Sequence, residues 1–156
     1  MFLSKESGGQ RNNRLSFRSL MTSERDFGFQ LAALREQIAL WKKTMTIRIK
    51  ELTSKYGALN AKAFPGRAAV LIKLLDLDHE IIKAVYERPN SMKIGHFVPG
   101  TRIPIKCESE LFAMSPSPPV ILNLAWHISA EIRDYLKQHG FFGDVVDILE
   151  PKDFVK

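Results

Sequence analysis

The sequence predicts an α/β fold with a mostly parallel sheet of about five strands, covered by helices on both faces and preceded by a long N-terminal helix. Two observations lead to this prediction. From residue 56 onward, short apolar or β-branched runs alternate with helical segments, and strands joined through helices form right-handed crossovers in a parallel sheet. Before them, apolar residues recur every three or four positions over about three heptads, a spacing typical of a long amphipathic helix.

The long helix is predicted from about Gln30 to residue 55. Gly57 follows its last periodic residues, and Lys50 and Lys55 lie in its final turns. Glycine just past a helix and cations near the negative end of its dipole predict that the helix stops there. Two interpretations of its apolar stripe stay open: the stripe covers one face of its own domain, or it forms a coiled-coil homodimer through the 30–55 helix. The stripe consists of Leu31, Leu34, Ile38, Trp41, Met45, Ile49 and Leu52.

The remaining elements follow in chain order, with glycine and proline between them. The predicted strands span residues 58–64, 80–87, 102–107, 120–126 and 143–151. Helical segments are predicted over 67–75, 108–114 and 127–140, and the last of these points Ile128, Ile132, Tyr135 and Leu136 inward and stops at Gly140. A long loop rich in proline and glycine (88–101) and a linker (115–119) complete the chain. About five strands therefore alternate with helices, as a parallel sheet requires.

Composition limits the classes of function. The chain has 156 residues, enough for one domain with an appended arm. Residues 1–55 hold 11 Lys or Arg and 5 Asp or Glu, whereas residues 56–156 hold 12 of each, so the net charge of +6 lies on the N-terminal segment. No aromatic residues alternate with basic ones there, so we expect no nucleic-acid partner. No apolar run is long enough to span a membrane, and a single cysteine (Cys107) with four scattered histidines predicts neither a disulfide nor a metal site. We therefore expect a cytoplasmic protein.

Ligands of open parallel sheets bind beyond the carboxyl ends of the strands. Phe64, Pro65, Gly66 and Arg67 follow the first predicted strand and lead into a helix, whose N-terminal N–H groups and dipole favour an anion such as phosphate. Arg67 is suited to a bidentate phosphate contact. Glu87 follows the second strand, 20 residues after Arg67, near the spacing of a ribose-binding acid in dinucleotide folds. This spacing favours an alternative function as an independent dinucleotide-binding module.

Histidines, a lysine and a tryptophan add further candidates at the same edge. Trp126 and His127 end the 120–126 strand, where a histidine serves either as a general base or as a structural hydrogen-bonding residue. His96 lies with Lys93 in the 88–101 loop, where both are suited to phosphate or sugar hydroxyls. No serine, cysteine or lysine lies in a sequence context that would activate it as a nucleophile. The sequence therefore predicts binding residues and no catalytic residue.

Two segments carry a resemblance to a known family. "VYERPNSMKIGHFVPGTRIPI" (85–105) and "NLAWHISAEI" (123–132) combine a strand-end acid, Lys-x-Gly, Pro-Gly-Thr-x-Ile-Pro-Ile and Leu-Ala-Trp-His. Over about residues 30–151 the chain resembles the C-terminal domain of S-adenosylmethionine-dependent sugar C-methyltransferases. Aligning the family's first strand by its distance from Glu87 and Leu71 places the family's binding loop on residues 63–67. Ala63 then stands where the family has glycine, and Arg67 stands near its basic loop position.

The resemblance implies a Rossmann-like three-layer domain over residues 30–156 that binds a nucleotide-linked sugar or a similar phosphate-bearing substrate. It implies S-adenosylmethionine as the cofactor of the full-length enzyme, held by a separate methyltransferase domain or subunit and not by this chain. Residues 1–29 form a basic arm that resembles the end of such an upstream domain. We therefore expect this chain alone not to catalyse methyl transfer. A further alternative is a protein-interaction subunit that recruits its partner through the 30–55 helix.

Overall fold

The computed structural model describes residues 9–154, and the side chains of residues 27–154. The chain divides into two compact units, residues 1–39 and 40–156. The first eight residues of the basic arm lie outside the described part of the chain. Helix α1 (Gly9–Tyr56) begins well before Gln30, where the stripe of apolar residues led us to expect its start. The division of the chain at residue 29 stays a prediction.

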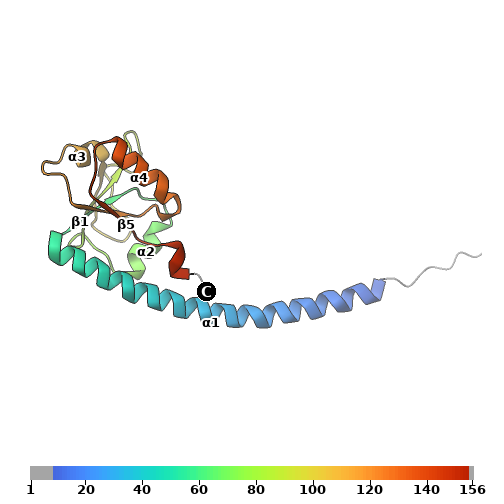
Figure 1. Ribbon diagram of the computed structural model, residues 1–156. Coiled ribbons are helices and arrows are strands. Elements are labelled where there is room, and N and C mark those ends of the chain that lie inside the picture. Colours follow the sequence, from blue (N-terminus) through green and yellow to red (C-terminus); the bar gives the residue numbers. More distant parts are fainter. Residues whose placement is uncertain (1–8, 155–156) are drawn as a thin grey trace, which may run out of the picture. The chain divides into compact units, whose positions relative to one another are not determined.

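A five-stranded, wholly parallel sheet forms the centre of the 40–156 unit (Figure 1). Its order is β3-β2-β1-β4-β5, with β1 Leu59–Lys62, β2 Ile82–Glu87, β3 Ile105–Cys107, β4 Val120–Asn123 and β5 Asp144–Asp147. The helices are α2 (Ala68–Leu74), α3 (Glu108–Phe112) and α4 (Ser129–Gln138), with short 3₁₀ helices η1 (Trp126–Ile128) and η2 (Pro151–Phe154). The chain builds outward from β1 to β3 and then crosses to β4, which confirms the predicted α/β fold.

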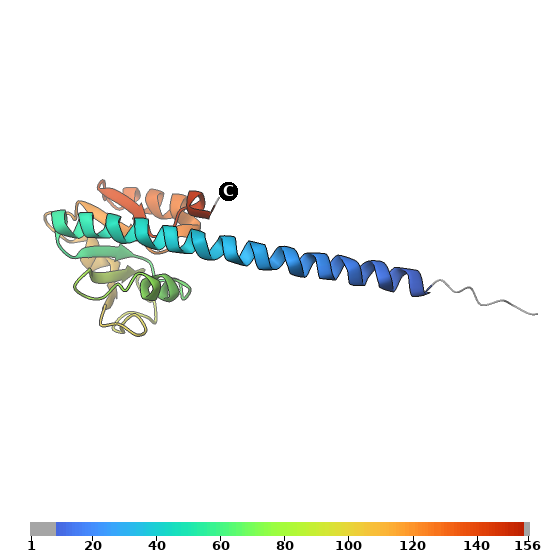
Figure 2. The ribbon, with the colours of Figure 1, turned by 90° about the horizontal axis from the view of Figure 1, so that it is seen from below.

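Helices cover both faces of the sheet. On one face, Trp41, Met45 and Ile49 of α1 pack with Ile72 of α2 against alternate strand residues; Figure 2 shows this part of α1 beside the sheet. On the other face, a second cluster contains Leu111 of α3 with Ile132 and Leu136 of α4. The stripe of α1 therefore covers its own domain over residues 41–52. N-terminal to this segment, the large apolar side chains Phe27, Phe29, Leu31 and Leu34 are exposed.

Three predicted strands end earlier than expected: β1, β4 and β5, of which β5 stops at Asp147 instead of residue 151. The first two end for a local reason. β1 stops at Lys62 because Ala63 adopts a left-handed backbone conformation (φ +59°). β4 stops at Asn123 because the Asn123 side chain accepts the N–H of Ala125 (3.0 Å), which bends the chain out of the sheet. Trp126 consequently lies in η1, and Ile128 is exposed, so its predicted inward position is wrong.

Both predicted glycine stops are confirmed. Gly57 (φ +75°) and Gly140 (φ +81°) have the left-handed conformation that glycine adopts without strain. The N–H of Gly57 donates to the carbonyl of Thr53 (2.9 Å), and that of Gly140 to the carbonyl of Lys137 (3.0 Å). Tyr56-Gly57 is therefore the end of a helix and contributes no binding loop.

Candidate functional site

The candidate site lies at the carboxyl edge of the sheet, where the strand order reverses between β1 and β4. Chain segments that leave neighbouring strands at such a reversal diverge to opposite faces and leave space between them. A hydrogen bond from the N–H of Leu124 to the carbonyl of Lys62 (3.1 Å) joins the two exit points. The β1–α2 loop (Ala63–Arg67) and the η1 turn (Trp126–Ile128) therefore begin side by side.

Phe64 of the β1–α2 loop forms one connected group with Glu87, at the end of β2, and Lys93, in the loop after β2. The Glu87 carboxylate accepts the N–H of Phe64 at 2.6 Å and lies 3.3 Å from the Lys93 ammonium. Lys93 also donates to the carbonyl of Phe64 (2.6 Å), so each of the three residues contacts the other two and they form a ring of contacts. The structure thus brings together three predicted site residues from two segments. One Glu87 oxygen accepts both of these contacts, so the carboxylate has a structural role in addition to any role in binding a ribose.

The first turn of α2 differs from our expectation of free N–H groups. The N–H groups of Ala68, Ala69 and Val70 donate to the carbonyls of Pro65, Gly66 and Arg67 (2.8–3.3 Å). These i→i−3 bonds occupy the donors that an α-helical start would leave free. Within the described residues, the N–H groups of Gly66 and Arg67 have no acceptor. An anion would therefore meet the loop before α2 and not the helix itself.

Arg67 of the β1–α2 loop and Trp126 of the η1 turn lie close to each other at the candidate site. The Arg67 guanidinium lies 6.0 Å from the Trp126 ring centroid, at the outer limit of a cation–π contact. The His127 ring stands edge-on to the same indole (5.6 Å, 79°). Arg67 and His127 are exposed, and Arg67 forms no ion pair with any described residue. A free cation, an aromatic face and an imidazole therefore border the same edge.

His96 does not join these contacts. It lies in the loop between β2 and β3, where its backbone pairs with Ile105. Its side chain is exposed and forms no hydrogen bond or ion pair with another residue in the described part of the chain. Of the predicted site residues, His96 is the one that the structure does not connect to the others.

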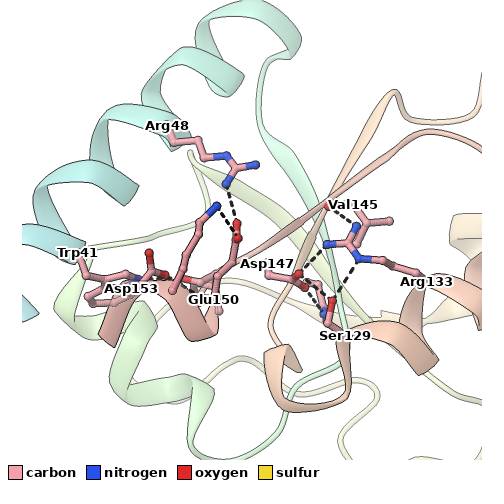
Figure 3. Close-up of polar contacts among 11 residues, drawn as sticks. Trp41, Arg48, Ser129, Arg133, Val145, Asp147, Glu150 and Asp153 are labelled. Carbon is pink, nitrogen blue, oxygen red and sulfur yellow. Dashed lines mark hydrogen bonds and ion pairs between the residues drawn. The ribbon is translucent and has the colours of Figure 1, made fainter. Parts of the chain in front are cut away.

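A buried polar network beneath the η1 turn was not predicted from the sequence (Figure 3). Asn123 Nδ2 donates to Asp147 Oδ1 (2.6 Å), and Asp147 Oδ2 accepts from Ser129 Oγ (2.7 Å) and Arg133 Nη2 (2.6 Å). Asn123 and Asp147 are fully or almost fully buried. The available signal was a polar residue inside each of two apolar runs, "VILNLAW" and "DVVDIL", because a buried polar residue needs a partner.

A second buried network, also missed, follows β1 on the α3–α4 face. Lys62 forms an ion pair with Glu108, and Tyr135 donates to the other oxygen of Glu108 (2.5 Å). Burial by itself raises the pKa of Glu108, but the hydrogen bonds from Lys62 and Tyr135 outweigh it and hold the pKa below its ordinary value. Burial, followed by the bond to Glu108, raises the pKa of Tyr135. The network is charge-balanced and internally satisfied, so we assign it a structural role.

Comparison with the sequence profiles of known families identifies the family of this chain. A sequence profile described as "C-methyltransferase C-terminal domain" matches residues 1–143. The chain belongs to this family. No curated protein matches the sequence. The domain is therefore a methyltransferase-associated α/β domain, and the resemblance seen at residues 85–105 and 123–132 is confirmed.

Two general features complete the description. Within the described residues, no helix combines the length and the apolar character needed to cross a lipid bilayer. Among the same residues, no three His, Cys, Asp or Glu side chains gather in a group that could hold a metal ion.

Proposed function

We propose that this domain binds the substrate of an S-adenosylmethionine-dependent C-methyltransferase, a nucleotide-linked sugar or a similar phosphate-bearing molecule. The proposed site lies between the Ala63–Arg67 loop and the Trp126–Ile128 turn. The observation that carries the proposal is the convergence, at the switch point of the sheet, of an aromatic face with an arginine and two backbone N–H groups that have no partner among the described residues.

Each group has a proposed role. Arg67 and the N–H groups of Gly66 and Arg67 bind phosphate, since guanidinium and amide donors suit its oxygens. Trp126 stacks on the sugar or base, and His127 donates to or accepts from a hydroxyl group. The ring of Phe64, Glu87 and Lys93 holds the loop in place. His96 remains a proposed outer contact of the substrate.

S-adenosylmethionine is proposed to be held by a separate methyltransferase domain or subunit. The loop after β1 does not fit a tight nucleotide cradle, because its first two N–H groups, on Ala63 and Phe64, already donate to the Tyr86 carbonyl and to Glu87. The proposed partner supplies the methyl donor, and this chain orients the acceptor. We propose that this chain and its partner act in the cytoplasm. The single cysteine of the chain is a free thiol, so the fold requires no oxidising compartment.

Isothermal titration calorimetry of the full chain tests this function. UDP-glucose, dTDP-glucose, GDP-mannose, NAD and S-adenosylmethionine form the panel of ligands. We expect a nucleotide-sugar to bind and Arg67→Ala to weaken it roughly ten-fold, the order expected for one charge-assisted contact. Arg102→Ala, an exposed arginine in another loop, is the matched control. Tight binding of S-adenosylmethionine alone would contradict the proposal, and preference for NAD would favour the dinucleotide-binding alternative.

A second candidate function, an interaction subunit, is favoured by the exposed apolar residues of α1. Leu31 and Leu34 continue the stripe of Trp41 and Met45 but are 37% and 42% exposed. A homodimer through this helix can use only the segment before Trp41, because the rest of the stripe is buried in its own domain. Light scattering of the wild type and of Leu31→Glu/Leu34→Glu tests it. A monomer in both cases excludes self-association.

A further inference from the structure

The η1 turn is fixed at both ends by the same pair of buried side chains. Upstream, Asn123 Oδ1 accepts the N–H of Ala125, the residue before the turn (3.0 Å). Downstream, Asp147 Oδ2 accepts the hydroxyl of Ser129, the residue after the turn (2.7 Å). Asn123 and Asp147 bond to each other at 2.6 Å, so the two ends of the turn are linked through one continuous set of hydrogen bonds. Figure 3 shows the downstream part, at Asp147, Ser129 and Arg133. We call Asn123 and Asp147 the clamp.

Sheet register explains why the clamp forms. Asn123 and Asp147 are register partners at the ends of the parallel strands β4 and β5. Register partners on adjacent strands direct their side chains to the same face of the sheet, where the two groups are neighbours. Arg133 of α4 then fixes the carboxylate, since its Nη2 donates to Asp147 (2.6 Å), its Nε to Ser129 (3.2 Å) and its Nη1 to the carbonyl of Val145 (2.6 Å).

Of the residues that the clamp holds, Trp126 packs partly buried against the core, whereas His127 and Ile128 are exposed. None of Trp126, His127 and Ile128 is fully buried, whereas Asn123 is 0% and Asp147 7% exposed. Burying a carboxylate and an amide is costly unless both are fully hydrogen-bonded, and an apolar pair would cover the sheet equally well. What the polar pair adds is direction, because hydrogen bonds to Ala125 and Ser129 fix the orientation of the exposed turn between them.

We propose that Asn123 and Asp147 are positioning residues, which orient Trp126 and His127 toward the substrate. Neither residue touches the ligand. The expected effect on ligand affinity rests on the proposed substrate-binding function. The orientation of Trp126 by the clamp rests on the hydrogen bonds alone.

The test uses reversal of the pair. Asp147→Asn turns an amide N–H₂ toward Arg133, so one link of the network is lost. The double variant Asn123→Asp/Asp147→Asn reverses the bond between the two residues and restores every partner: the aspartate accepts from Ala125, and the asparagine oxygen accepts from Ser129 and Arg133. Ser129→Ala is a milder variant that removes only the downstream link. Tyr86→Phe is the matched control, because it removes a buried hydrogen bond to Asn60 elsewhere in the sheet.

Labelling with 5-fluorotryptophan gives a readout independent of ligand. The chain has two tryptophans, so ¹⁹F NMR yields one resonance for Trp126 and one for Trp41. An added fluorine standard serves as the reference, because the Trp41 indole donates to the carbonyl of Ile148, next to Asp147 (3.0 Å). We expect Asp147→Asn and Ser129→Ala to shift or broaden the Trp126 resonance, the double variant to restore it, and Tyr86→Phe to leave it unchanged. An unaltered Trp126 resonance in both disrupted variants, or an equal change in Tyr86→Phe, would overturn the positioning role.

Calorimetry with UDP-glucose, or with whichever nucleotide-sugar the wild type binds, gives the second readout. We expect Asp147→Asn to weaken binding roughly ten-fold, because a displaced contact loses its alignment, and the double variant to recover it. Unchanged affinity despite a shifted Trp126 resonance would overturn the role in binding. If the wild type binds no nucleotide-sugar, the proposed function fails, while the ¹⁹F spectra still decide whether the clamp orients the turn.

Discussion

The two segments that border the candidate site follow neighbouring strands, yet they are held in different ways. The Ala63–Arg67 loop is fastened from outside by Lys93, whose side chain is 47% exposed. The Trp126–Ile128 turn is fastened from below by the buried clamp of Asn123 and Asp147. The loop that carries the proposed phosphate contacts is thus tied by the solvent-exposed Lys93 together with Glu87, whose side chain is 13% exposed, whereas the turn that carries the aromatic face is tied by two buried side chains.

This difference matters because hydrogen bonds and ion pairs depend on their surroundings. A partly exposed pair is screened by water and contributes little, whereas a buried polar group that loses its partner has no water to replace it. We therefore expect the β1–α2 loop to open easily and the η1 turn to stay rigid. A movable loop beside a fixed aromatic platform suits the proposed function, in which a substrate enters the site and the loop then closes on its phosphate.

The largest expected effect concerns the ion pair of Lys62, at the end of β1, with Glu108. This pair is buried like the clamp at the end of β4, but among the described residues it forms no hydrogen bond with the β1–α2 loop. Glu108→Gln leaves the Lys62 ammonium buried without a counter-charge, and we expect a loss of about 3–5 kcal/mol in the free energy of unfolding near pH 7. Urea denaturation measures it. Glu110→Gln, on the exposed face of the same helix, should change stability by less than about 0.5 kcal/mol; equal effects would contradict the assignment.

The same pair predicts a pH dependence. Because the pKa of folded Glu108 lies below its ordinary value of 4.5, ionised Glu108 stabilises the fold above that value, and this contribution is lost as the pH falls through the folded pKa. The difference in stability between the wild type and Glu108→Gln should therefore narrow in acid. Denaturation curves recorded at pH 7 and at successively lower pH values test the sign.

The next effect concerns the clamp. Asp147→Ala leaves Asn123 and Arg133 without their common acceptor, and we expect a loss of about 2–3 kcal/mol, less than for the ion pair because Arg133 is partly exposed and can be hydrated. Asp144→Ala, at the exposed start of the same strand, is the control and should have little effect. Equal denaturation midpoints for the two variants would show that the clamp contributes no stability.

A smaller effect is expected where the β1–α2 loop is tied from outside. Lys93→Ala removes the ion pair with Glu87 and the bond to the Phe64 carbonyl, and we expect a loss of stability below about 1 kcal/mol. Local opening should nevertheless increase, so the amide hydrogen of Phe64, which Glu87 accepts, should exchange faster, while the bonded amide hydrogens of the 124–128 segment should not. Lys106→Ala, which breaks an exposed pair with Glu110, is the control. Faster exchange in both segments would contradict independent fastening.

The sequence predicted the elements of the fold and most of the positions of the site, because both depend on local patterns. Apolar spacing and glycine stops located α1 and α4, and the ends of β1, β2 and β4 located Arg67, Glu87 and Trp126 at one edge. The sequence alone did not predict which strands are neighbours in the sheet. The bond between Asn123 and Asp147 depends on β4 and β5 being adjacent and in register, and local periodicity contains neither fact. The i→i−3 start of α2 was likewise hidden, since "FPGRAA" is compatible with either type of helix start.

The smallest effect has the opposite sign and concerns the first residue of the β1–α2 loop. Ala63 has φ +59°, a left-handed conformation that costs a residue with a Cβ roughly 1–2 kcal/mol. Glycine removes this strain but adds freedom to the unfolded chain, worth about 0.5–1 kcal/mol. We therefore expect Ala63→Gly to raise the free energy of unfolding by about 0.5–1 kcal/mol, measured by urea denaturation. Ala69→Gly, inside α2, should instead lower it by about 1 kcal/mol. If both variants lose stability, the left-handed conformation of Ala63 carries no strain.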